Sequence, residues 1–349
     1  MMEVDFDPRG RNGTLEGGRF VANIATLKEG ERFDAFFKIR EYEARQSRAG
    51  REYLDLTLED ATGEVPAKVW EPATQVQGEI QAGDFIKVRA AAENYQGRLQ
   101  LRVDRVRRVN EQDYESGFKP EDCVQRTPYD IDVMWEEAKR IAGGCHPLVA
   151  AYLTAILNEY EEKFREWPAA QRIHHPYLGG LLEHTLSVTK TCLYLADKYD
   201  VSKDLLVAGA LLHDIGKLEE LSTEGATHYT AAGRLLGHIV LGRDIAREWA
   251  EREGVFQEGE ALPGDFLLHL EHLILSHQGQ PDWGTVKVPM SAEALLLHYA
   301  DDMDAKFNIL KRAVAEDTGD EDFTARNHTM ARVFYKGGPP LPPENAPDV

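Results

Sequence analysis

The sequence predicts a multidomain protein of α and β class, in which a small N-terminal β-barrel precedes an all-α domain. From residue 19 to residue 109, short segments of alternating polarity follow one another between turn-forming residues, as half-buried strands do. From residue 132 to residue 335, apolar residues recur with the 3.6-residue period of amphipathic helices. The polar residues 110–131 separate the two patterns and are predicted to be the interdomain linker.

Five segments of the first region show the alternation of strands that bury one face. Turn-forming residues separate them, as at Arg48–Gly50 and Ala61–Gly63. Five short strands with such turns are typical of a small closed barrel. The segments are Phe33–Arg40, Tyr53–Leu58, Glu64–Trp70, Phe85–Ala90 and Arg98–Val103.

The second region contains long amphipathic segments, which must bury their apolar faces on one another and so predict an all-α domain. The clearest are Val149–Leu157, Leu186–Tyr199, Leu235–Trp249 and Phe266–Ile274. Residues 1–18 are rich in Gly, Asp and Arg without an apolar period, so we expect a flexible leader. Residues 336–349 are rich in Gly and Pro and are predicted to be a disordered tail.

Composition limits the class of protein. Hydrophobic content of 42% and charged content of 29% over 349 residues are ordinary for a soluble globular chain. We find no apolar run that approaches a membrane span and no signal-peptide pattern, so we expect a cytoplasmic protein without membrane contact. The three cysteines form no Cys-x-x-Cys pair, which favours a reducing compartment and argues against structural zinc.

The formal net charge of −20 argues against broad electrostatic adhesion to nucleic acid. However, residues 31–108 contain about as many Lys and Arg as Asp and Glu, so the acidic excess lies elsewhere. Outward cations of the barrel could follow phosphates, and its aromatics could stack on bases; the same residues could equally be core, cross-strand pairs or a solvated face. The candidates are Lys38, Arg40, Tyr53, Lys68, Trp70, Arg89, Tyr95, Arg98 and Arg102.

The most informative stretch is Leu205–Lys217, an apolar run that ends in adjacent His213 and Asp214. An isolated His-Asp pair is usually an ordinary helix end. Burying a carboxylate beside an imidazole is costly without a compensating cation, and both groups are common ligands of divalent metals. Matching residues in other helix-like segments favour a metal site. They are His184, His238, His272, His277 and Asp301.

Four motifs together resemble the HD-domain metal-dependent phosphohydrolases over about residues 170–310. They are His174–Thr185, His213–Lys217, Ile274–Gly279 and Leu295–Lys306. Within that superfamily the chain is most similar to the YhaM-type exoribonucleases, which carry an OB fold ahead of the HD domain. The resemblance implies a metal-dependent 3′→5′ exonuclease that hydrolyses single-stranded RNA, with DNA left open, to nucleoside 5′-monophosphates.

The resemblance also implies which side chains hold metal. A first set combines His184, His213, Asp214 and Asp301, with Asp302 and Asp304 as rivals for the last place. A second set adds His238 and His277, with Asp214 bridging; superfamily members with only the first set use one ion. Such ligands suit manganese, iron, cobalt or nickel, and the resemblance points to manganese. Divalent metals acidify a bound water and bind phosphoryl oxygens, so hydrolysis needs no nucleophilic side chain.

Several further residues are candidates for contact with the substrate. Lys217 lies one helical turn beyond His213 and could reach a phosphate, or it could be a surface lysine. His272 competes with His277 as a ligand; otherwise it contacts the phosphate or is a core histidine. His174 and His175 are predicted to line the substrate mouth. Gln278 departs from the family pattern, which often has a second histidine there.

Two rival functions use the same residues. One is an HD phosphohydrolase acting on a small nucleotide, such as a deoxynucleoside triphosphate or a cyclic or alarmone nucleotide. The other is a nucleic-acid-binding regulator whose HD domain only senses nucleotides; the apparently complete ligand set argues against it. Enzymes of this type often form homo-oligomers, but the sequence shows no stripe that identifies an interface.

Overall fold

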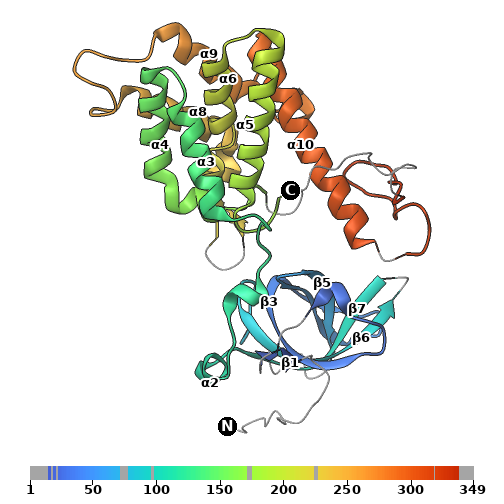
Figure 1. Ribbon diagram of the computed structural model, residues 1–349. Helices are drawn as coiled ribbons and strands as arrows, with labels where there is room; N and C mark the ends of the chain where they lie inside the picture. Colours follow the sequence, from blue (N-terminus) through green and yellow to red (C-terminus); the bar gives the residue numbers. More distant parts are fainter. Residues whose placement is uncertain are drawn as a thin grey trace.

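The computed structural model describes residues 15–16, 19–20, 23–70, 78–95, 98–170, 175–223, 227–317 and 319–337. Within them, a β-barrel and a helical domain lie one above the other (Figure 1), so the predicted order of the two folds is confirmed. Apart from residues 15–16 and 336–337, the predicted leader and tail lie outside this part of the chain.

The barrel is closed by five strands in the order β3-β4-β5-β7-β6. All pairings are antiparallel except that of β5 with β7, which is parallel. Each predicted strand segment lies within one of these strands, apart from Trp70, which directly follows β5. They are β3 (Arg32–Gln46), β4 (Glu52–Asp60), β5 (Gly63–Val69), β6 (Phe85–Tyr95) and β7 (Arg98–Arg108); the shorter β1 (Leu15–Glu16), β2 (Arg19–Phe20) and η1 (Ile24–Thr26) precede them.

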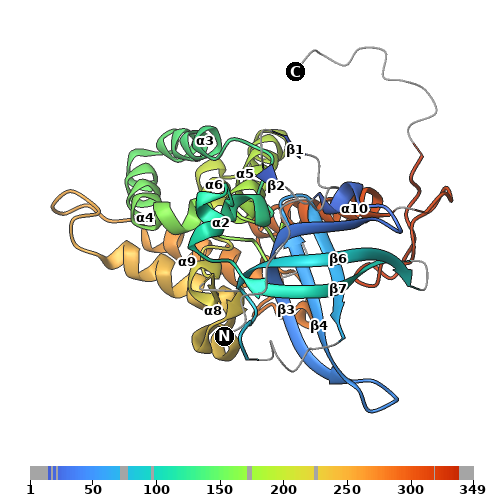
Figure 2. The same ribbon diagram turned by 90° about the horizontal axis from the view of Figure 1, so that it is seen from below.

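Alternation along the strands fills the barrel interior with apolar side chains. In β4, for example, Leu54, Leu56 and Leu58 are buried, while the residues between them are more exposed. Burying such a side chain stabilises the fold by about 1.5–3 kcal/mol. β3 and β4 continue beyond the barrel as a hairpin, paired as far as Gln46 and Glu52 (Figure 2).

The segment predicted as a linker is ordered and packs on the barrel. It contains α2 (Glu111–Glu115) and η2 (Pro120–Cys123). Asn110 and Asp113 form a reciprocal capping box at the start of α2. Phe118 and Cys123 pack against Phe36 of β3, so the apolar residues of a mostly polar segment anchor it to the barrel.

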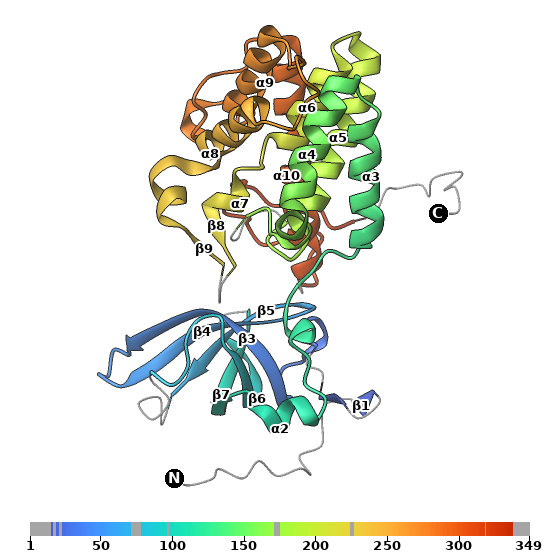
Figure 3. The ribbon, with the colours of Figure 1, turned by 90° about the vertical axis from the view of Figure 1, so that its left-hand side faces the viewer.

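The helical domain contains eight α-helices among its described residues, packed around a single apolar core. They are α3 (Ile131–Gly143), α4 (Pro147–Glu166), α5 (Gly180–Tyr199), α6 (Lys203–Leu212), α7 (Lys217–Glu220), α8 (Ala231–Glu251), α9 (Gly264–Ser276) and α10 (Ala292–Glu316). The domain is not purely helical. The short strands β8 (Leu221–Ser222) and β9 (His228–Tyr229) pair on its barrel-facing side (Figure 3), and η3 (Pro281–Trp283) follows α9.

α6 lies at the centre of this domain. Every residue from Leu205 to Leu212 is buried, and α5, α9 and α10 all contact the helix. Gly209 allows the closest approach, because a Cβ there would overlap the side chain of Leu273 in α9. A helix that is apolar all round must be enclosed, and this enclosure places its C-terminal end, with His213 and Asp214, in the interior.

In the described part of the chain we find no helix with the length and apolarity needed to cross a membrane.

Close packing between α7 and α8 predicts a severe effect of Gly216→Ala. The new Cβ would overlap the carbonyl oxygen of His238 and the backbone nitrogen of Gly242. We expect the free energy of unfolding to fall by about 1–3 kcal/mol, as for overpacked cores, measured by urea denaturation. Gly143→Ala at the end of α3 is the control, since a Cβ there meets nothing within 4 Å. Equal stability of the two variants would contradict the packing described.

Candidate metal centre

The centre forms where several helices end or bend toward one point. α6 ends at Leu212, and His213 directly follows it as the C-cap residue. The Nδ1–H of His213 donates to the carbonyl of Ala210 at 2.8 Å. That carbonyl belongs to the last helical turn, which lacks helical donors, so the helix end fixes the ring and directs Nε2 away from the helix.

His277 repeats this arrangement at the end of α9. It is the C-cap residue after Ser276, and its Nδ1–H donates to the carbonyl of Ile274 at 2.7 Å. In both histidines the ring nitrogen that carries the proton is therefore fixed by a backbone acceptor. Nε2 therefore carries the lone pair, which is the usual arrangement of metal-binding imidazoles. At His277 this nitrogen lies 3.3 Å from Nε2 of Gln278, so the Gln278 amide can donate to it.

The first cluster joins three elements. His184 of α5 and His213 approach with their Nε2 atoms 3.2 Å apart, and Oδ1 of Asp301 in α10 lies 3.2 Å from Nε2 of His184. Oδ2 of Asp214 lies 3.5 Å from His184 Nε2 and 3.3 Å from His213 Nε2. One ligand atom each of His184, His213 and Asp301 falls within 4.8 Å of the other two, so these side chains can share one cation.

The second cluster lies on the other side of the same carboxylate. Oδ1 of Asp214 is 3.5 Å from Nε2 of His238 in α8 and 3.7 Å from Nε2 of His277. These three ligand atoms also lie within 4.8 Å of one another. All six candidate metal ligands thus meet at one place, with Asp214 between the two triads.

Two polar atoms of the centre lack a hydrogen-bond partner among the described residues. Asp214 Oδ1 and His238 Nε2 are buried and have no hydrogen-bond partner among the residues described. Burial and the neighbouring His213 lower the pKa of His277 to about 3, so this ring is neutral near pH 7. Buried acceptors without donors are rare, and a divalent cation would satisfy both the carboxylate oxygen and the imidazole lone pairs. The residues present therefore fit a metal.

The pKa shifts at the first cluster agree with this. Burial alone would lower the pKa of His184, but the carboxylates of Asp214, Asp301 and Asp304 outweigh it and raise the pKa well above its ordinary value. Burial would likewise raise the pKa of Asp214, but Lys217 and His213 hold it well below its ordinary value. The three carboxylates around His184 therefore favour positive charge, which a proton or a metal ion can supply.

A break in α8 places His238. Gly237 has φ 76° and ψ 158° inside the helix, a conformation that favours glycine. The backbone N–H of His238 donates to Oε1 of Glu220 at 2.9 Å, and its Nδ1 lies 3.1 Å from the same oxygen. Burial would raise the pKa of Glu220, but the bonds from His238 lower it overall. Glu220 was not predicted from the sequence, since its spacing resembles that of any charged residue on a helix.

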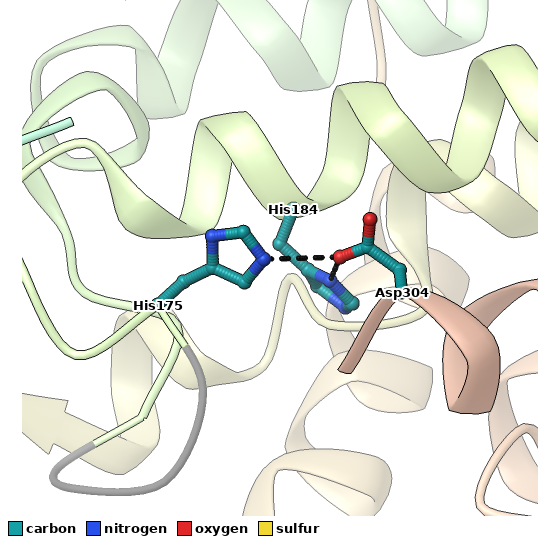
Figure 4. A group of neighbouring side chains, drawn as sticks. All are labelled: His175, His184 and Asp304. Atoms are coloured by element: carbon teal, nitrogen blue, oxygen red, sulfur yellow. Dashed lines mark hydrogen bonds and ion pairs between the residues drawn. The ribbon is translucent and has the colours of Figure 1, made fainter. Parts of the chain in front are cut away.

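Asp304 plays the corresponding part for His184 (Figure 4). Its Oδ2 accepts from Nδ1 of His184 at 2.8 Å and from Nε2 of His175 at 3.0 Å, while Ser187 donates to Oδ1 at 2.5 Å. Burial opposes ionisation, yet these donors hold the pKa of Asp304 far below its ordinary value. The sequence presented Asp304 as a rival of Asp301; in the structure the two carboxylates face different nitrogens of His184.

His175, predicted at the substrate mouth, is buried and faces Asp304 instead. Its backbone has φ 45°, an unusual conformation for a residue with a side chain. Its N–H donates to Oδ1 of Asn308, and Nδ1 lies 2.9 Å from the hydroxyl of Tyr177. These contacts make His175 a support for His184 through Asp304. His174 lies outside the described residues.

Lys217 is a buried residue rather than a surface lysine. Its Nζ donates to Oδ2 of Asp214 at 2.5 Å, so its ammonium group lies beside the centre. His272, by contrast, belongs to none of the candidate metal groups found among the described residues. Its Nε2 accepts from the backbone N–H of Met290 at 2.9 Å, an arrangement that ties the loop before α10 to α9.

The barrel residues predicted to bind nucleic acid differ in their exposure and in their ion-pair partners. Tyr53 and Trp70 stack with centroids 4.7 Å apart, and Trp70 and Tyr95 are exposed. Most of the cations have acidic partners in the barrel, which weakens their availability for phosphates. Lys68 pairs with Asp55, Arg89 with Asp34, Arg40 with Glu64 and Glu59, Arg102 with Glu93 and Asp104, and Lys38 with Glu59; the side chain of Arg98 lies outside the description.

About a quarter of this chain matches solved structures at low identity. One is the second OB-fold domain of replication protein A from Methanococcus maripaludis, 17% identical, with a TM-score of 0.22; the match covers 26% of this chain and 95% of that one. Another is a mitochondrial single-stranded DNA binding protein from S. cerevisiae, 16% identical, with a TM-score of 0.21; it covers 24% of this chain and 97% of that one.

Sequence families match both domains. Residues 181–306 match the HD domain family, and residues 38–109 match an OB-fold nucleic acid binding domain. The chain is also 33% identical over 316 residues to the 3′-5′ exoribonuclease YhaM of Geobacillus sp. (strain WCH70), a match that covers 90% of this chain and 94% of that protein. Because this similarity extends over almost the whole length of both proteins, this chain belongs to the YhaM family, with an HD domain and an OB-fold domain.

Proposed function

We propose that this protein is a metal-dependent 3′→5′ exoribonuclease, which removes nucleoside 5′-monophosphates one at a time from the 3′ end of single-stranded RNA. The observation that carries the proposal is the buried Asp214 carboxylate, whose two oxygens face separate groups of candidate metal ligands. Its family relative is named as an exoribonuclease, and the barrel belongs to a nucleic-acid-binding family. In this proposal the metal centre supplies the hydrolytic chemistry, and the barrel supplies a surface that binds the RNA strand.

Each group of residues has a role in this reaction. His184, His213, Asp214 and Asp301 would hold one ion, and Asp214, His238 and His277 a second. Bound divalent ions supply an activated water and neutralise developing negative charge on the phosphate. Asp304 and Glu220 orient the imidazoles of His184 and His238. Lys217, which donates to Asp214, would also donate to a phosphate oxygen of the substrate.

The proposed metal is manganese. A set of four imidazoles and two carboxylates is compatible with manganese, iron, cobalt or nickel, and the family resemblance favours manganese. The proposed RNA preference follows from the name of the relative, because discrimination at the 2′-hydroxyl depends on contacts with bound substrate.

Removing the central carboxylate charge should abolish activity. We expect Asp214→Asn to lower kcat on 5′-labelled single-stranded RNA with Mn²⁺ by more than about 100-fold, because even outer residues of metal sites contribute 10–100-fold. Asp302→Asn is the control, since Asp302 pairs with Lys306 outside the centre. Undiminished digestion by Asp214→Asn, with the control also active, would refute the proposed role of Asp214.

The carboxylate of Asp304, which accepts from Nδ1 of His184, should affect metal binding. Asp304→Asn should weaken Mn²⁺ binding roughly 10- to 100-fold, because an amide accepts the Nδ1–H of His184 less strongly than a carboxylate does. Calorimetric titration of metal-free protein with Mn²⁺ measures this directly. If affinity is unchanged while the variant remains folded, Asp304 does not tune the metal site.

The exposed ring of Trp70 should contribute to RNA binding by the barrel. Trp70→Ala should raise the Kd for single-stranded RNA roughly 5- to 150-fold, since stacking of a base on an aromatic ring contributes about 1–3 kcal/mol. Fluorescence anisotropy with labelled RNA measures the change. Tyr199→Ala, at an exposed aromatic of the helical domain, should bind like the wild type. Identical affinity of both variants would exclude Trp70 from the binding surface.

A further inference from the structure

A cavity of about 430 Å³ lies between the barrel and the helical domain. Lys38, Arg40 and Glu59 line it from the barrel, and Pro176, Tyr177 and Thr223 line it from the helical domain. Figure 3 shows the β8–β9 hairpin and the barrel facing each other across this region. The volume falls within the range of about 300–1,000 Å³ that is typical of ligand sites.

Lys38 is the cation that stands out in this cavity. Its side chain is only 16% exposed, and the one ion pair it makes among the described residues, to Oε1 of Glu59, is long at 3.9 Å. Arg40, in contrast, is held closely by Glu64. Desolvation by burial is the main reason that the pKa of Glu59 lies above its ordinary value, so the charged form of this partner is disfavoured. The ammonium group of Lys38 can therefore donate to an anionic group of a ligand that comes closer than Glu59 does.

The opposite wall combines a proline and an aromatic ring with the polar Thr223, Thr227 and His228. Pro176 and Tyr177 line it, and the hydroxyl of Tyr177 is fixed by Glu183 at 3.1 Å and by Nδ1 of His175 at 2.9 Å. The cavity thus offers Lys38 and Arg40, beside the carboxylates of Glu41 and Glu59, on one side and the Tyr177 ring on the other. A cation and an aromatic ring are the groups that contact the phosphate and the base of a nucleotide.

The chain runs from two places in the helical wall of the cavity to residues of the metal centre. Pro176 follows His175, which bonds to Asp304 and through it supports His184. On the other side, Lys217 begins α7, and α7 runs into β8 and then into Thr223 of the cavity wall. The cavity is therefore joined to the centre by two short stretches of chain, on the side of the helical domain that faces the barrel.

We propose that this cavity is a subsite for a nucleotide of the single-stranded substrate on the 5′ side of the scissile bond, with Lys38 contacting its phosphodiester. The inference rests on the proposed exonuclease function: the 3′-terminal nucleotide reacts at the metal centre, so the remaining strand leads away from it in the 5′ direction. The cavity offers that strand a route toward the barrel. Strands too short to reach Lys38 lose this contact.

The test compares substrates of different length. Full-length Lys38→Met protein keeps the side-chain stem but lacks the ammonium group. With Mn²⁺ and 5′-labelled single-stranded RNA of stepped lengths, we expect its KM to rise roughly tenfold for long strands, with kcat within about twofold of the wild type. The shortest oligonucleotides and bis(p-nitrophenyl) phosphate should be turned over as by the wild type. Lys38→Arg should restore most of the affinity for long strands.

Controls separate the possible failures. Lys28→Met removes an exposed lysine in the loop before β3, outside the cavity, and should leave KM unchanged at all lengths. If Lys38→Met shows wild-type KM for long strands, or an equal loss for every substrate including the small diester, the subsite is refuted. A wild-type protein that digests none of these RNAs refutes the exonuclease function itself. Urea unfolding of each variant verifies that the kinetic comparison is made between folded proteins.

Discussion

The interaction on which the helical domain depends is the burial of the Asp214 carboxylate among four imidazoles. A carboxylate removed from water without compensating charge costs several kcal/mol, so the surrounding helices must supply positive charge or a metal. α5, α8 and α10 each contribute one side chain to the candidate ligand set, and His213, Asp214 and His277 directly follow the ends of α6 and α9. Lys217 adds an ammonium group at 2.5 Å. The apolar enclosure of α6 is what brings this polar end inside the protein.

The four imidazoles of the centre share one hydrogen-bonding arrangement. Each lies with Nδ1 at hydrogen-bond distance from an oxygen and Nε2 toward Asp214. The oxygen is a backbone carbonyl for His213 and His277, which follow helix ends, and a carboxylate for His184 and His238. Helix ends have carbonyls without helical donors, so the same feature that terminates α6 and α9 also orients the rings after them. Carboxylates serve where the ring lies within a helix, as at His184, or directly after a break, as at His238.

Much of this could be predicted from the sequence because it follows from periodicity and from motif residues. The barrel strands, the helical domain and the six candidate ligands all fall in that class. Glu220 and Asp304 do not, because their roles depend on which nitrogen of an imidazole they meet. His175 was expected at a mouth but lies buried and bonded to Asp304, in a backbone conformation (φ 45°) that the sequence pattern does not indicate. The pairing of Lys68 with Asp55 depends on the register between β4 and β5, which alternation alone does not specify.

Anomalous scattering from crystals soaked in Mn²⁺ would show directly whether Asp214 binds metal, because it locates the ions without reference to activity. We expect strong anomalous density in contact with the Asp214 carboxylate, with one ion beside His184, His213 and Asp301 and a second beside His238 and His277. Density confined to other sites, with none at Asp214 under saturating Mn²⁺, would contradict it.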